Sequence, residues 1–177
     1  MASVISHPAV PLALAVALGP DRVPPALTVV ACAASALPDI DAVGYAAGVP
    51  YGHMFGHRGF THSLFFALAA ALVCSLFAER LGATPLMTFL LVFAATASHG
   101  LLDALTTGGM GVAFFSPFSN RRYFLPWHVI LVSPIGVSDF LSERGFRVLR
   151  SELIWIWLPS SIVAMLGFLI RKLATGT

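Results

Sequence analysis

"PLMTFLLVFAATASHGLLDAL", residues 85–105, is an apolar segment whose only charged side chain stands near its end. About 20 such residues form a helix that crosses the hydrocarbon core of a bilayer, so we expect a membrane-spanning helix here. His99 and Asp103 are four residues apart and share one face of that helix. Ionisable side chains in a membrane segment are costly and usually belong to a functional site. The alternative is a His–Asp hydrogen bond that only joins helices.

The whole chain has the composition of a membrane protein. Of its 177 residues, 58% are hydrophobic and 10% are charged, whereas soluble domains carry roughly 25% charged residues. The net charge of +2 is too small to indicate a nucleic-acid partner, which requires a concentrated basic surface. The length suits one membrane-embedded domain, residues 1–177.

Further apolar segments flank the first one. Residues 63–79 are just long enough to span a bilayer and should form an antiparallel pair with residues 85–105, because only the turn "RLGAT" separates them. Residues 153–170 make a third candidate span, with a kink expected at Pro159. Residues 8–18 and 24–37 are shorter, and we interpret them as a helical hairpin packed on the long pair.

The fold class that follows is all-α: an integral membrane bundle of four to five helices. Residues 38–62 and 106–129 are predicted loops, and residues 138–150 a basic amphipathic helix on the membrane surface. If each apolar segment crosses once, His7, both loops and the 99–107 stretch lie on one membrane face. Arginines are more numerous on that face, which favours a cytoplasmic location for it.

Polar side chains with metal-binding chemistry gather on that predicted face. Asp39 and Asp41 lie in "LPDID", and His57 and His62 lie in "GHRGFTHS", residues 56–63. If residues 39–41 are extended, one aspartate binds and the other supports it, since alternate side chains point apart. Imidazole with carboxylate suits zinc and neighbouring first-row ions such as manganese or iron. The sequence therefore predicts a metal site on one membrane face.

Several side chains in the same loops can hold an anion. Arg58 stands between the histidines, and "FSNRRYF" contributes Asn120, Arg121 and Arg122. Arginine matches phosphate with two parallel hydrogen bonds, which makes these residues candidates for substrate binding. The alternatives are contacts with lipid headgroups for Arg121 and Arg122, and an internal carboxylate partner for Arg58.

Taken in order, "LPDID", "GHRGFTHSL", "SHGLLDALTTGG" and a following "SPF" resemble the YdjM-like family of inner-membrane-associated, metal-dependent hydrolases. The similarity covers roughly residues 37–126, and His7 fits a histidine usual near the N-terminus of that family. A more distant likeness is to zinc-dependent phospholipase C, onto which Asp41 or Asp39, His62, His99 and Asp103 would map as ligands. The resemblance implies an inner-membrane protein, a bound metal and hydrolase chemistry, without a defined substrate.

The leading hypothesis is a membrane-embedded hydrolase that cleaves a phosphoester of a lipid with a metal-activated water. One or two ions, zinc above all, would be held within the set Asp39, Asp41, His57, His62, His99 and Asp103. Asp41, His57 and Arg58 would act in catalysis, with Arg58, Asn120, Arg121 and Arg122 on the substrate. The alternative is a non-enzymatic membrane protein that binds or transports a metal, or that holds haem between His62 and His99. Oligomeric state stays open.

Overall fold

Every regular element in the computed structural model, which describes residues 1–134 and 140–175, is helical. Within those ranges the strand-like pairing consists of two isolated bridges, Thr106 with Ile130 and Val112 with Tyr123. This confirms the predicted all-α fold. The helices are α1 (Ala9–Leu18), α2 (Pro25–Ala36), α3 (Asp41–Ala46), α4 (Leu64–Ser75), α5 (Pro85–Ala104), α7 (Glu143–Glu152) and α8 (Leu158–Thr175). Tighter 3₁₀ turns are η1 (Leu37–Ile40), η2 (Phe60–His62) and η3 (Ala78–Leu81), and η4 (Leu153–Trp157) is a π-helical turn.

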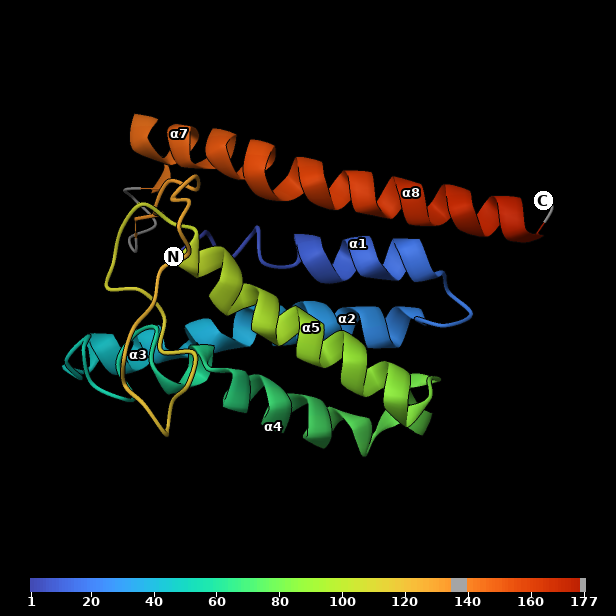
Figure 1. Ribbon diagram of the computed structural model, residues 1–177, viewed down its shortest axis with the longest axis horizontal. Coiled ribbons are helices and arrows are strands. Elements are labelled where there is room, and N and C mark those ends of the chain that lie inside the picture. The colour runs from blue at the N-terminus through green and yellow to red at the C-terminus, as the bar shows by residue number, and fades with distance from the viewer. Residues whose placement is uncertain (135–139, 176–177) are drawn as a thin grey trace.

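The helices stack side by side in one bundle (Figure 1). Helix α5 packs against both α2 and α4, while α1 packs between α2 and α8. Small buried residues line these contacts, among them Ala31 on α2, Ala71 on α4 and Ala95 on α5. Helices in membranes rely on such small residues because they let backbones approach closely. The described residues thus form five rods, α1, α2, α4, α5 and α7–α8, as predicted.

Three helical segments are long and apolar enough to cross a membrane: Pro25–Ala46, Pro85–Ala104 and Glu143–Ala174. Two predictions about length were wrong. The segment 24–37 does not end in a loop, since η1 and α3 continue its helical path to Ala46. The segment 63–79 is helical only to Ser75, whose hydroxyl donates to the Leu72 carbonyl and competes with the backbone there.

The predicted surface helix is instead part of a rod. Helix α7 runs through the π-helical turn η4 directly into α8, so it does not fold separately onto the membrane. Residues 138 and 139 of that prediction lie outside the described residues. The irregular turn ends at Trp157, two residues before Pro159, which lacks an N–H and crowds the carbonyl four residues earlier. The structure thus shows a change of helix type close to Pro159, and the kink itself stays a prediction.

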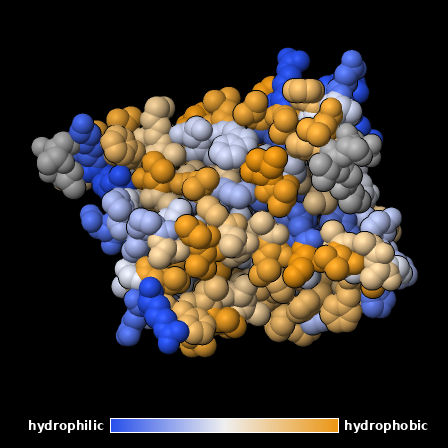
Figure 2. All heavy atoms as spheres, turned by 180° about the vertical axis from the view of Figure 1, so that it is seen from behind, coloured by the Kyte–Doolittle hydropathy of each residue, from blue (hydrophilic) through white to orange (hydrophobic). Residues whose placement is uncertain are grey.

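The two ends of the bundle differ, as the connectivity predicted. At one end lie the segment before α1, α3 and the loops after α3 and α5; at the other lie the α1–α2 and α4–α5 turns and the C-terminal end (Figure 1). Seen from behind, apolar residues cover much of the middle, and strongly hydrophilic ones gather toward the ends (Figure 2). The elements that carry the histidines and aspartates of the predicted metal site therefore lie at one end of the bundle.

Candidate metal centre

Four separate segments bring histidine and aspartate side chains together at that end. His99 and Asp103 lie on the last turns of α5, Asp39 lies in η1, His62 ends η2, and His7 precedes α1. Gly100 makes this meeting possible, because a Cβ there would stand 2.8 Å from the carbonyl oxygen of His62. The absent side chain lets η2 rest directly on α5.

The centre is built around two imidazoles that face each other. The Nδ1 of His99 donates to the Ser35 carbonyl oxygen at 2.7 Å, and the Nδ1 of His62 lies 3.1 Å from Oδ2 of Asp41. Each neutral ring therefore presents the lone pair of its Nε2, and the two Nε2 atoms are 3.0 Å apart. Two lone pairs at this distance repel unless a proton or a cation lies between them.

Two carboxylates complete this group. Oδ1 of Asp39 lies 3.4 Å from Nε2 of His99 and 3.9 Å from Nε2 of His62, while Oδ2 of Asp103 lies 3.5 Å from Nε2 of His62. Both oxygens of Asp39 and Oδ2 of Asp103 are buried without a hydrogen-bond partner. Buried carboxylate oxygens without partners are costly, and a cation relieves that cost. The donor set thus fits a divalent ion.

The distance between the Nε2 atoms of His62 and His99 distinguishes ligation of one metal ion from ligation of haem. Ligands of one tetrahedral ion lie about 3.3 Å apart, because each metal–nitrogen bond is about 2.0 Å. Two axial histidines on opposite sides of one iron would instead need about 4 Å between their nitrogens. The 3.0 Å between His62 and His99 agrees with the first arrangement. Haem between these two residues is therefore not supported.

Asp41 contacts the residues around the two facing imidazoles and fixes their positions. Its Oδ1 lies 2.7 Å from Nδ1 of His57, and its Oδ2 accepts hydrogen bonds from the Thr61 hydroxyl and the Arg58 backbone N–H. Together with the contact to His62, these occupy both oxygens. Such a carboxylate–histidine pair fixes the orientation of a metal ligand. In this structure Asp39, and not Asp41, faces the two Nε2 atoms.

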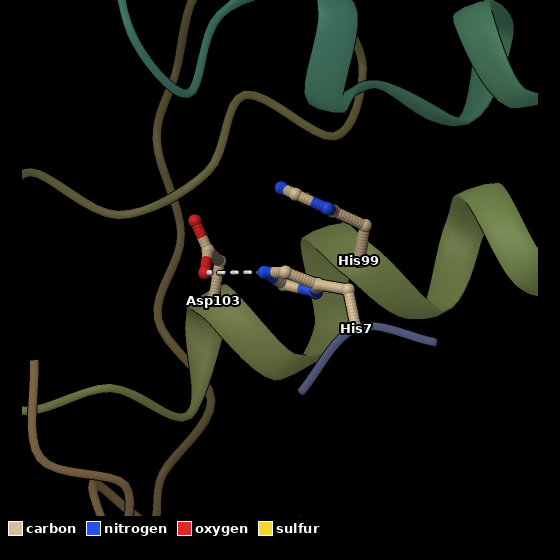
Figure 3. A group of neighbouring side chains, drawn as sticks. All are labelled: His7, His99 and Asp103. Carbon is tan, nitrogen blue, oxygen red and sulfur yellow. Dashed lines mark ion pairs between the residues drawn. The ribbon is translucent and has the colours of Figure 1, made fainter. Parts of the chain in front are cut away.

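His7 is the residue that sequence reasoning had left outside the predicted ligand set. Its ring is fully buried and stacks on His99, and its Nε2 lies 3.9 Å from Oδ1 of Asp103 (Figure 3). Two groups can each hold an ion: His7 with His99 and Asp103, and Asp39 with His57 and His62. The sequence signals for His7 were the connectivity, which places it on the same membrane face as the predicted site, and the resemblance to the family.

The charge states of two histidines follow from their surroundings. Burial lowers the pKa of His7 to about 3, so its ring is neutral at neutral pH. Burial also opposes a charge on His62, but the adjacent carboxylates of Asp103 and Asp41 outweigh it and raise its pKa to about 9. Without a cation, His62 therefore carries the proton that lies between the two facing rings.

Arg58 is an internal partner of the centre. Its side chain is fully buried, with Nε 3.0 Å from Oδ2 of Asp103 but not aligned for a hydrogen bond. Its other nitrogens donate to the carbonyl of Gly108 and the hydroxyl of Thr106 at 2.9 Å each. Its φ of 62° is unusual for a residue with a side chain and marks a constrained position. These contacts favour the alternative of an internal carboxylate partner, while the substrate-binding role stays a prediction.

The other candidates for anion binding divide into two kinds. The guanidinium of Arg122 donates to the carbonyls of His57, Tyr51 and His53, so it holds the loop that carries the centre. Asn120 and Arg121 are exposed beside it, with Arg121 over the Tyr123 ring. Arg122 is therefore occupied, and Asn120 and Arg121 remain accessible.

Fold and site define an α-helical integral membrane protein with a buried histidine–aspartate group that can hold a metal ion. The model of the family described as YdjM inner membrane protein matches residues 1–174, and the chain belongs to this family. It is similar to the inner membrane protein YbcI of Escherichia coli (strain K12), with 42% identity over 164 residues, which cover 92% of this chain and 95% of that protein. No solved structure matches it significantly. Membership of the family and inner-membrane residence, both predicted from the sequence, are thus confirmed.

Proposed function

We propose that the protein is a membrane-embedded hydrolase whose divalent metal, zinc above all, is held by Asp39, His62, His99 and Asp103, with His7 as a further candidate ligand beside His99 and Asp103. The observation that carries this is the pair of facing Nε2 atoms, 3.0 Å apart beside carboxylate oxygens without partners. The carboxylates of Asp39, Asp41 and Asp103 and the guanidinium of Arg58 give the centre a formal side-chain charge of minus two, which a divalent cation would balance. When bound, such an ion supplies Lewis acidity and a water that ionises near neutral pH.

The residues of the chain would then have distinct tasks. Asp41 and the Ser35 carbonyl fix the tautomers of His62 and His99, so that both Nε2 atoms point into the centre. Arg58 balances Asp103 and holds the loop at Gly108. His57 is paired with Asp41, which suits a role in proton transfer or as a ligand.

The position of the centre supports a lipid substrate. It lies at the end of candidate membrane spans, where a reactive group meets the headgroup layer of the bilayer. The exposed Asn120 and Arg121 are suited to a phosphate on that surface. A phospholipid phosphoester is therefore the substrate class that we propose.

The test combines metal analysis of the purified protein with hydrolysis of bacterial phospholipids, using His99→Ala as the matched control. We expect one or two divalent ions per chain. We also expect phosphoester cleavage that is lost when the metal is lost. A bound metal without cleavage of any lipid would reject the hydrolase and favour a non-enzymatic metal-binding protein. A protein that binds no divalent metal would reject both.

A further inference from the structure

A basic pocket lies between α7 and the segment that follows α5, apart from the candidate metal ligands. One part, with a volume of about 210 Å³, is lined by Thr107, Val132, Arg144 and Val148 among others. A second part, of about 280 Å³, is lined by Arg150, Ser151, Ile154 and Trp155 among others. Leu131 and Arg147 line both parts, so the two are neighbours. The walls are apolar and the rim carries arginines.

The arginines of this rim have no acidic partner among residues 1–134 and 140–175. Arg144, Arg147 and Arg150 stand at every third position of α7, and all three are exposed. The nearby carboxylate of Glu152 is buried and accepts hydrogen bonds from Ser3 and Ser6 instead. Among the described residues, the pocket therefore presents arginines without an ion-pair partner above an apolar wall.

The depth of the pocket in the bilayer follows from the length of its helix. The candidate span Glu143–Ala174 has 32 residues, whereas about 20 residues cross the hydrocarbon core. Helix α8 accounts for most of the crossing, and Trp155 and Trp157 are residues typical of the membrane interface. The arginines of α7 then lie beyond the hydrocarbon, at the level of the lipid phosphates.

We infer that this pocket binds the phosphate headgroup of an anionic membrane phospholipid. The arginine rim contacts the phosphate, while Leu131, Ile154 and Trp155 contact the upper part of the acyl chains. Basic pockets beside membrane helices recognise anionic headgroups in this way. The inference does not depend on the proposed hydrolase, because none of these residues belongs to the metal centre.

The experiment is native mass spectrometry of the whole protein in detergent with phosphatidylglycerol or phosphatidylcholine of identical acyl chains. We expect the protein to retain phosphatidylglycerol and to lose phosphatidylcholine. The double variant R147Q/R150Q should bind phosphatidylglycerol roughly thirtyfold more weakly, since each basic side chain near an anionic surface contributes about 1 kcal/mol and about 1.4 kcal/mol is tenfold. R144Q/R147Q, a second pair on the same rim, should show the same loss.

The matched control is R22Q/R80Q, which removes two exposed arginines at the opposite end of the bundle. It should retain phosphatidylglycerol as the wild type does. Equal losses in the control and in the rim variants would overturn the inference, because net charge alone would then explain binding. Displacement of the lipid by free glycerol phosphate would also overturn it, because the pocket would then be a site for soluble anions.

Discussion

The imidazole of His7 lies flat on that of His99, with ring centroids 3.6 Å apart, yet neither ring nitrogen of His7 has a hydrogen-bond partner. An unpaired polar group in a fully buried place costs about 1–3 kcal/mol. Such a cost is tolerated where a ligand supplies the missing partner. The stacked pair therefore couples the segment before α1 to the metal centre.

The variant His7→Phe distinguishes the contribution of ring stacking on His99 from the contribution of the His7 ring nitrogens to metal binding. Phenylalanine keeps a flat ring on His99 but offers no ligand, so the metal-free variant should be at least as stable as the wild type. Its affinity for zinc should be at least tenfold lower, as measured by competition with a chromogenic chelator. A less stable variant with unchanged zinc affinity would show that His7 serves packing alone.

Asp39→Asn and Asp103→Asn should both lose metal but differ in stability. Asp39 has no hydrogen-bond partner for either oxygen, so its amide variant should unfold near the wild-type temperature without metal. Asp103 pairs with the buried Arg58 and accepts the N–H of Ala2 at 2.7 Å. Its variant leaves a buried arginine uncompensated, which costs about 3–5 kcal/mol. Thermal unfolding of the metal-free proteins in detergent measures this difference, and equal unfolding temperatures would contradict it.

Asp41→Asn tests the shell behind the ligands. Because Asp41 orients His62 and His57 without facing the two Nε2 atoms, its loss should weaken zinc binding about 10- to 100-fold and not abolish it. His53→Gln, on the same loop but exposed, is the control and should bind zinc normally. Complete loss of zinc in Asp41→Asn would instead identify this aspartate as a direct ligand.

Much of the fold could be predicted because apolar length and connectivity leave few arrangements for a membrane chain. The helix ends could not be predicted in the same way. Hydropathy continues past Ser75, but the side-chain hydrogen bond to the Leu72 carbonyl and the following 3₁₀ turn are local events. Likewise, η1 and α3 continue the helical path through Asp39 and Asp41, although residues 38–62 had been predicted as a loop.

The sequence predicted which residue types form the candidate site, but it predicted less well which of their side chains point into it. The spacing of His99 and Asp103 fixes their common face on a helix. The two-residue spacing of Asp39 and Asp41 does not say which of them points inward, because that depends on how η1 meets α5. The partner of Arg58 is also a matter of tertiary packing, since Thr106 and Gly108 lie far along the chain.

Gly100→Ala is the most direct test of how η2 is seated on α5. An added Cβ would lie 2.8 Å from the His62 carbonyl oxygen and 3.3 Å from the Phe114 ring, so η2 must move away. Alanine favours a helix over glycine by about 1 kcal/mol, while overpacking costs about 1–3 kcal/mol. The two effects nearly cancel in stability, but the Nε2 atoms of His62 and His99 separate. We therefore expect a small change in unfolding temperature and a loss of zinc affinity, with Ser98→Ala on the same helix as the unaffected control. Normal zinc binding by Gly100→Ala would show that the contact between η2 and α5 does not set the geometry of the centre.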